Sequence, residues 1–469
     1  MAQNITGAHQ MKIPRRILNS VLTSLSSGVV PRTGAPYIAI GRQKEIASLL
    51  SDLQITSEGG SAMRFIIGRY GSGKSFLLQL IRGYCTEQGF VCMDADLSPE
   101  RRLYGSGGSG VATYRELIKN MSTKSSPDGG ALHSIIERQL SAARQEAAMG
   151  GIGTDSENHV EAVQDIIRRQ LKELRLSVGG FDFCEVLARY FSSLMNEDDS
   201  QTAACLRWLR GEYSTKSEAK RALGFSVSCV PDDDNWYDFV KLWAVYSRIC
   251  GYKGLVVMLD ECVNLYKITN RISRENNYEK LLSMFNDTLS ARATGLMMLF
   301  CGTPQFLEDS RRGLFGYEAL RSRLCDSRFA TADVESVNGP VIRLRRLSDD
   351  EMFALILRVK ALHAQLYPNS PEISPEQAER FYRVCNSRAG ASEMLTPREM
   401  IRDFLYVLDT LRDNPTLSFD ALIGQRTENE GKSAAGESGT AYTSAQANMT
   451  AGDVSTNERV RPSPEDIEI

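Results

Sequence analysis

The sequence has few of the features that would place it outside the cell or in a membrane. Its ten cysteines are scattered and include no CxxC pair, and several lie in apolar runs, where a reduced thiol packs as a small hydrophobe. The first residues, MAQNITGAHQMK, lack the apolar core of a signal peptide, and no stretch of about 18 uncharged apolar residues could span a bilayer. We therefore expect a soluble, cytoplasmic protein with no membrane partner.

Metal-binding and strongly basic patterns are also missing. The four histidines are far apart in sequence and have no companion cysteines at metal-ligand spacing, so we predict no zinc site.

The charge of the chain does not favour nucleic acid. With 55 Lys and Arg against 58 Asp and Glu, the formal net charge of −3 gives no whole-chain attraction to nucleic acid. Any DNA contact must be local. Arg343, Arg345 and Arg346 form such a cluster, although a strand-end cluster is usually solvated or paired.

The apolar pattern predicts an α/β fold with a parallel sheet. A short strand at Phe65–Ile67, a helix starting at Lys74 and a second strand within 89–98 give the order strand, helix, strand. Continuous apolar runs at 254–261 and 295–304 indicate buried central strands, and 340–348 adds another short one. A further short strand is expected in VVPRTGAPYIAIGRQKEI, ahead of these. Between 105 and 250 the apolar spacing is helical throughout.

The stretch FIIGRYGSGKSFLLQL matches GxxxxGK[ST] with a strand before it and an apolar helix after it, the context that a phosphate-binding loop requires. Small residues let consecutive backbone N–H groups converge on phosphate at the positive end of the helix. Lys74 is expected to reach the β- and γ-phosphates, and Ser75 to hold Mg²⁺. The residues predicted to bind nucleotide here are Gly68, Tyr70, Gly71, Ser72, Gly73, Lys74, Ser75 and Phe76.

The run GLVVMLDE ends in the two carboxylates that hydrolysis needs. Asp260, at the end of a buried strand, is expected to accept a hydrogen bond from Mg²⁺-bound water, and Glu261 to orient and deprotonate the attacking water. The structural alternative is a pair of acidic residues that simply ends a strand.

Three more positions are candidates for contact with the nucleotide. Thr303 ends the strand of MMLFCGTP and could hydrogen-bond the γ-phosphate or the attacking water, unless its hydroxyl only serves the turn. Arg323, in the arginine-rich stretch after it, is our candidate for an arginine finger that projects into a neighbouring protomer, with Arg321 next. Arg398, just after Pro397 at a helix start, could swing onto the phosphates.

One further dipeptide precedes the phosphate loop. Gly41 and Arg42 lie before a helix where the adenine edge and ribose are expected, and the alternative is an ordinary turn from strand to helix.

Taken together, GR-x-x-E, the phosphate loop, hhhDE, GTP after a strand and T-P-R-E resemble the AAA+ superfamily, over roughly 38–105 and 250–424. More closely, VVPRTG…IAIGRQKEI, RFIIGRYGSGKSFLLQL, DADLSPERRLYG and GYKGLVVMLDECVNLYK resemble the BREX system ATP-binding proteins (BrxD-like P-loop proteins), over about 12–424. The resemblance implies an AAA+ (ASCE-like) P-loop NTPase with a parallel sheet flanked by helices, a large helical insertion and a C-terminal helical lid.

The resemblance also implies ATP and Mg²⁺ as cofactors, a homo-oligomer, and protein partners from a bacterial anti-phage operon, and it leaves open whether DNA is a partner.

The expected segments are an N-terminal flank (1–37), the first part of the ATPase core (38–104), the helical insertion (105–250), the second part of the core (251–347), the lid (348–424) and a disordered tail (425–469).

Two functions remain open at this point. The first is an oligomeric ATPase that drives or loads a partner, and the second is a slowly hydrolysing ATP-dependent switch or scaffold. A P-loop kinase for small molecules fits less well, because such chains are shorter and lack the arginine of the lid.

Overall fold

The computed structural model of the protein describes residues 13–156, 158–326, 337–387 and 396–424. The chain divides into two compact units, Met1–Phe419 and Asp420–Ile469, and every helix and strand named here belongs to the first. The expected tail, 425–469, lies outside the described residues. Within the described ranges, no helix is both long and apolar enough to cross a membrane.

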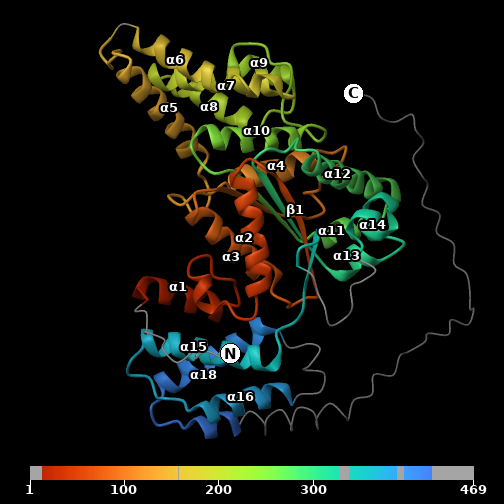
Figure 1. Cartoon of the computed structure of the whole chain (residues 1–469). Helices are drawn as coiled ribbons and strands as arrows, with labels where there is room; N and C mark the ends of the chain where they lie inside the picture. Colours follow the sequence, from red (N-terminus) through yellow and green to blue (C-terminus); the bar gives the residue numbers. More distant parts are fainter. Residues whose placement is uncertain (1–12, 157, 327–336, 388–395, 425–469) are drawn as a thin grey trace, which may run out of the picture. The chain divides into compact units, whose positions relative to one another are not determined.

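The expected parallel sheet is confirmed: its strands, of which β1 is labelled in Figure 1, are parallel and lie in the order β2-β3-β4-β1-β5. The strands are β1 Ala62–Gly68, β2 Val91–Asp96, β3 Leu255–Asp260, β4 Leu296–Gly302 and β5 Val341–Leu344. Every residue of β3 and β4 is buried, as is typical of central parallel strands. Because β4 pairs with both β1 and β3, the ends of these three strands meet at the carboxyl edge, where parallel sheets bind ligands.

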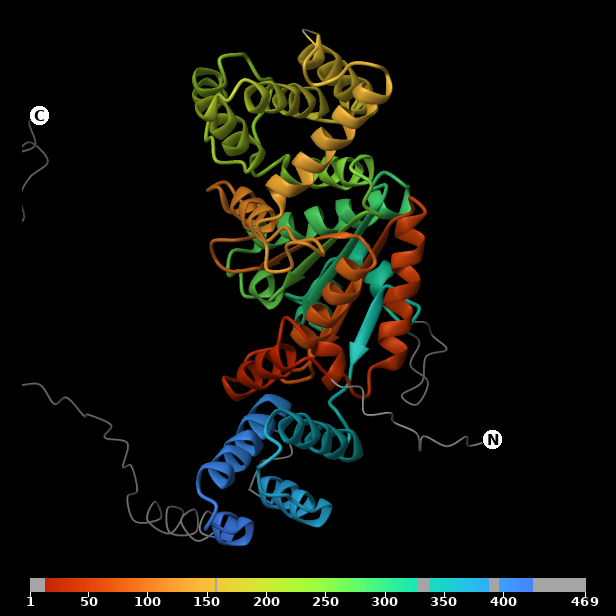
Figure 2. The ribbon, with the colours of Figure 1, turned by 90° about the vertical axis from the view of Figure 1, so that its left-hand side faces the viewer.

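Helices cover both faces of this sheet. On one face α2 (Gln43–Ser57) and α3 (Lys74–Glu87) run alongside the strands (Figure 2), and their leucines pack on Ile66, Val256 and Met297. The alternate strand residues, such as Phe65 and Val257, point to the other face. That face packs against α10 (Trp236–Ile249), α12 (Arg271–Leu289) and α13 (Pro304–Glu308). Burial on both sides fixes the register of the strands and therefore the position of their ends.

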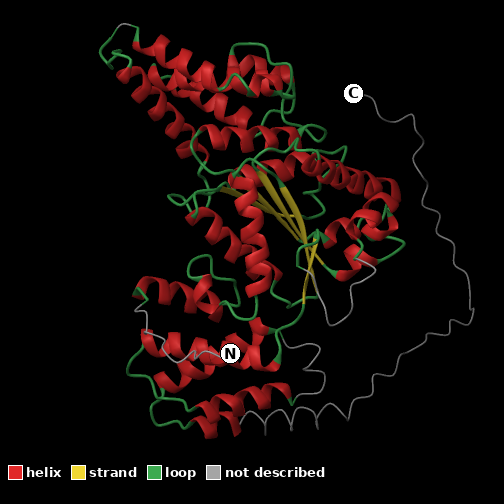
Figure 3. Cartoon of the chain, in the orientation of Figure 1, coloured by secondary structure: helices red, strands yellow, loops and turns green. Residues whose placement is uncertain are grey.

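The chain between β2 and β3 consists mainly of helices joined by loops in its described residues (Figure 3). Its helices before α10 are α4 Ser109–Lys119, α5 Leu132–Met149, α6 His159–Gln170, the 3-10 turn Leu174–Leu176, α7 Gly180–Met195, α8 Asp199–Leu209 and α9 Lys216–Leu223. A buried aromatic group joins them: Tyr114 donates to the carbonyl of Leu209 (2.7 Å) and accepts from the indole of Trp243 (3.0 Å). This core is continuous with the sheet face, so the helices extend the sheet's own core.

The helices that follow the sheet include α15 (Asp349–Leu366), α16 (Pro375–Asn386) and α18 (Pro397–Asp413). The expected capping box of Ser348 and Glu351 is present at the start of α15. The first helix of the described residues, α1 (Arg15–Ser26), packs against α15 and α18. The amino-terminal and carboxyl-terminal helices therefore share one interface.

The expected short strand before α2 is wrong. Residues Ala35–Ile38 form a 3-10 helix instead. Pro36 sits in its first turn, where the missing N–H costs nothing, and Gly34 precedes it with a left-handed φ of 82°. The apolar side chain of Ile38 is buried without any strand pairing.

Candidate functional site

The phosphate loop joins the end of β1 to the start of α3, as the sequence predicts. Gly71 and Gly73 have φ values of 76° and 88°, a region that favours glycine. At Gly68 a Cβ atom would lie only 2.2 Å from the hydroxyl of Ser72. The glycines are thus required by the local backbone, and the loop turns tightly enough to bring its amides to the amino-terminal end of α3.

Lys74 and Ser75 open α3 and point in different directions. The ammonium of Lys74 donates to the loop carbonyls of Gly68 (2.9 Å) and Arg69 (3.1 Å). The hydroxyl of Ser75 instead donates to a carboxylate oxygen of Asp260, at 2.6 Å. A hydroxyl beside a carboxylate is a donor set that suits Mg²⁺, which prefers oxygen ligands. The residues present therefore fit the predicted metal.

The carboxylate pair lies at the end of β3. Asp260 is nearly buried, and its second oxygen accepts the backbone N–H of Glu261 at 2.7 Å. Glu261 is exposed and has a left-handed φ of 55°, which is uncommon for a residue with a side chain. Such backbone outliers are concentrated at functional sites, where surrounding contacts stabilise them.

A third carboxylate, Asp96, lies opposite Asp260 in the register of β2 and β3. Although Asp96 is exposed at the strand end, desolvation by the groups around it and the nearby charge of Asp260 raise its pKa above the ordinary value. Our sequence reasoning did not select this residue. The sequence does show that the 89–98 strand ends in acidic residues. That these residues lie beside the end of β3 becomes clear only from the order of the strands in the sheet.

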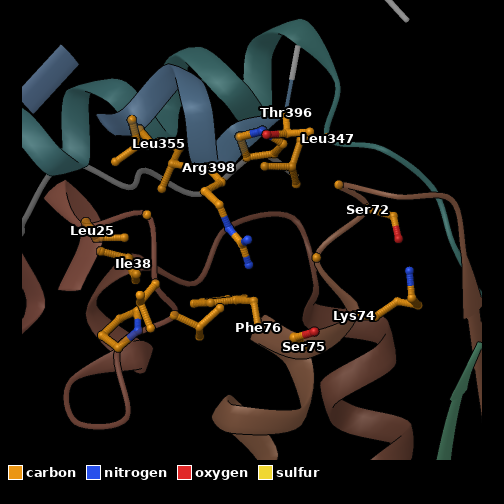
Figure 4. A pocket seen from close by; sticks show the side chains of 18 of the residues that line it. Leu25, Ile38, Ser72, Lys74, Ser75, Phe76, Leu347, Leu355, Thr396 and Arg398 are labelled. Atoms are coloured by element: carbon orange, nitrogen blue, oxygen red, sulfur yellow. The ribbon is translucent and has the colours of Figure 1, made fainter. Parts of the chain in front are cut away.

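A cavity of about 330 Å³ opens beside the loop, a volume in the range of small-molecule sites. Its polar side is lined by the loop, by the exposed Glu261 and by Arg398, whose side chain reaches from α18 toward Phe76 (Figure 4). Its apolar side comes from three separate segments of the chain. The apolar residues that line this side are Leu25, Val29, Val30, Pro31, Ile38, Ile40, Leu347, Leu355, Val359, Pro397 and Ile401.

Most of the predicted nucleotide contacts line this cavity. They are Arg42, Tyr70, Gly71, Ser72, Gly73, Lys74, Ser75, Phe76, Glu261 and Arg398. Arg398 lies in the first turn of α18, whose amino-terminal capping box is formed by Thr396 and Glu399. The apolar wall was not anticipated, because no single segment carries its pattern.

The upstream Gly-Arg pair is placed differently from our expectation. Gly41 is not among the lining residues, and a Cβ atom there would lie 2.4 Å from the carboxylate of Glu351. Arg42 is 4% exposed, and its guanidinium bonds to protein groups, including the carbonyl of Ser72 at 2.8 Å. Arg42 therefore contacts the loop and Gly41 lies beside Glu351, while the neighbouring residues Ile38 and Ile40 line the cavity.

Besides Gly41, four predicted residues do not line the cavity: Gly68, Asp260, Thr303 and Arg323. The hydroxyl of Thr303 caps α13 by accepting the N–H of Phe306 at 3.4 Å, at the expected place between the two motif strands. Arg323 is exposed on α14 (Glu318–Leu324), and its guanidinium donates to the carbonyl of Ala319 at 2.7 Å. Arg323 is therefore separate from the cavity of its own chain. Arg328, in the same arginine-rich stretch, lies outside the described residues.

The basic cluster at the end of β5 is largely paired. Arg343 contacts Glu308 and Asp326, and Arg345 lies 3.5 Å from Glu351. These pairings favour the solvated or paired reading of the cluster over a free phosphate-binding surface.

Comparison with known proteins agrees with this arrangement. No curated protein gives a significant match to the sequence. The family model of the BREX system ATP-binding protein BrxC/D matches residues 13–427, which include the whole sheet, the phosphate loop and the cavity. The chain therefore belongs to the BrxC/D family of BREX system ATP-binding proteins.

Proposed function

We propose that this protein binds MgATP in the cavity beside the phosphate loop and hydrolyses it to drive or gate a partner complex of a BREX anti-phage system. The observation that carries the proposal is the 2.6 Å hydrogen bond between Ser75 and Asp260. It joins the two motifs at one edge of the sheet, with Lys74 and Glu261 both lining the same cavity.

Each residue has a role in this proposal. The loop amides and the ammonium of Lys74 hold the phosphates, and Arg398 contacts them from α18. Ser75 and Asp260 would hold Mg²⁺, which when bound neutralises charge on the phosphates. Glu261, exposed at the cavity, orients the attacking water and accepts its proton. The apolar wall receives the base.

The cavity also supports a second candidate function, a switch that responds to ATP binding with little turnover. Thr396 caps α18 and Arg398 lies in its first turn, whereas the loop joins β1 to α3, and all of them line one cavity. A ligand there would bridge the two parts by binding alone. Differential binding of this kind is sufficient to shift a conformational equilibrium.

One assay separates the two functions. The steady-state ATPase rate is measured against protein concentration, with and without DNA, for the wild type, Glu261→Gln and the control Glu379→Gln on α16. A rate per protomer that rises with concentration and is lost only in Glu261→Gln supports the oligomeric ATPase. A flat, near-zero rate with tight ATP binding supports the switch. Absence of ATP binding in the wild type would contradict both, and stimulation by DNA would identify DNA as a partner.

A further inference from the structure

Arg42 makes an unusual set of contacts for a residue beside a nucleotide site. Its side chain is 4% exposed, and one nitrogen, Nη2, donates to the carbonyls of Ser72 (2.8 Å) and Arg345 (2.6 Å). The other terminal nitrogen pairs with the carboxylate of Glu45 at 3.2 Å. Ser72 belongs to the phosphate loop, and Arg345 directly follows β5. One guanidinium thus joins two segments that are far apart in the sequence.

We infer that Arg42 is a positioning residue that sets the phosphate loop and ties it to the connector leading into α15. The inference rests on the proposed function and deepens it, because it names the coupling between ATP binding and the helices that follow the sheet. Arg42 acts through the loop backbone and the connector, whereas Lys74 and Ser75 are expected to meet the ligand themselves.

The effect on the loop follows from the geometry of the peptide bond. The peptide between Ser72 and Gly73 is planar and trans, so its C=O and N–H point in opposite directions. Because Arg42 holds the carbonyl of Ser72, it also fixes the direction of the Gly73 N–H, away from Arg42. Gly73 has a φ of 88° and could otherwise rotate easily. A phosphate that accepts this N–H would polarise the same peptide and strengthen its bond to Arg42.

The connection continues from the connector to α15. The connector residues 345–348 run from the end of β5 to the first residue of α15, Asp349. The side chain of Arg345 lies 3.5 Å from Glu351, which also caps the helix by accepting the N–H of Ser348 at 2.9 Å. Gly41 packs directly against the same Glu351. Residues 41 and 42 therefore contact the loop on one side and the start of α15 on the other.

The chemistry explains why arginine is needed. Glu45 balances the buried charge, and the planar guanidinium satisfies three acceptors at once. Lysine could keep the charge but not the geometry. Methionine has a similar length and would leave the carboxylate and both carbonyls without a donor, which is costly in a buried site.

The test uses Arg42→Met, Arg42→Lys and a matched control, Arg64→Lys. Arg64 is a partly buried arginine held by a carboxylate, Asp52 (2.6 Å), and by a backbone carbonyl, that of Gly339, but it lies on β1 away from the loop. The measurements are ATP affinity by calorimetry, the thermal unfolding midpoint, and hydrogen exchange in peptides covering 69–73 and 345–352. Exchange is followed without ATP and at saturating ATP.

Without ATP, Arg42→Met should exchange faster than Arg64→Lys in both peptides. With ATP, the wild type and Arg64→Lys should show slower hydrogen exchange in the 345–352 peptide. Arg42→Met should bind ATP about 10-fold more weakly, and ATP should not slow exchange over 345–352 in this variant even at saturation. Arg42→Lys should lie between them. If Arg42→Met does not fold, the same comparison is made with Arg42→Lys alone.

Two results would separate the inference from the function on which it rests. Wild-type affinity and a full exchange response in the Arg42 variants would overturn the coupling and leave ATP binding intact. A wild type that does not bind ATP would overturn the proposed function, while faster ligand-free exchange in Arg42→Met would still support the tie between loop and connector.

Discussion

The hydroxyl of Ser75 donates a 2.6 Å hydrogen bond to Asp260, although the two residues are 185 positions apart in the sequence. Ser75 is set by the first turn of α3 and Asp260 by the last residue of β3. The buried side chains of α3 and β3 belong to one core cluster on the same sheet. The order of the strands therefore brings the start of α3 to the end of β3. This pair is also the expected Mg²⁺ site, and a direct test begins there.

Asp260→Asn should remove most of the Mg²⁺ dependence of ATP binding. The carboxylate is the charged member of the pair with Ser75, and its loss should weaken MgATP binding by about 10-fold or more while changing metal-free ATP binding far less. Titration of ATP with Mg²⁺ and with a chelator measures the difference. Asp94→Asn is the control, because Asp94 lies on the neighbouring β2 and faces Arg82. Equal Mg²⁺ dependence in both variants would contradict the metal site.

Gly71→Ala should weaken ATP binding and destabilise the fold for two separable reasons. A Cβ atom at Gly71 would lie 2.7 Å from the Cγ2 methyl of Thr396, and the φ of 76° costs about 1 kcal/mol for any other residue. Thr396→Ser removes the methyl group but keeps the hydroxyl that caps α18. The double variant should recover the part of the loss due to collision, measured by urea unfolding and calorimetry. No recovery would mean that Gly71 does not meet Thr396 in solution.

Leu355→Ala should weaken ATP binding without affecting inorganic tripolyphosphate. Leu355 lies on the apolar side of the cavity, so it is expected to contact the base and not the phosphates. Loss of that apolar contact should reduce ATP affinity by about 10-fold. Leu357→Ala is the matched control, since Leu357 lies on the same helix but does not line the cavity. A parallel loss of tripolyphosphate binding would place the base elsewhere.

Arg323→Ala should keep ATP affinity and lose hydrolysis, if Arg323 acts on a neighbouring protomer. The residue is exposed and does not line the cavity of its own chain. Mixing Arg323→Ala with Lys74→Ala should then restore part of the activity, because one variant supplies an intact cavity and the other an intact arginine. The ATPase rate of the mixture is compared with that of each variant alone. A mixture no more active than its components would exclude the finger, and Arg321 is the next residue to test.

The sequence predicts the parts of this protein that depend on local patterns. Apolar runs locate the strands of the sheet. The edge of the sheet that carries the site is indicated by the glycines of the phosphate loop, by Lys74 and by the carboxylates at the end of β3. The 3-10 turn at Ala35–Ile38 was mistaken for a strand, because YIAI has a strand-like composition and only the fold shows that it has no strand partner. Likewise, the role of Arg42 depends on Arg345, 303 positions away, and a contact over that distance leaves no local signature.

The order of the strands also has a consequence during synthesis. Ser75 leaves the ribosome well before Asp260, and at translation rates of about 5–20 residues per second the interval is roughly 10 to 40 s. During that time β2 and the helices α4 to α10 are made, but β3 is completed only with Asp260 and β4 follows later, and these two strands separate β2 from β1 in the sheet. During this interval Asp260 is not yet available to accept the hydrogen bond of Ser75. The proposed ATP site is therefore complete only after most of the chain has been translated.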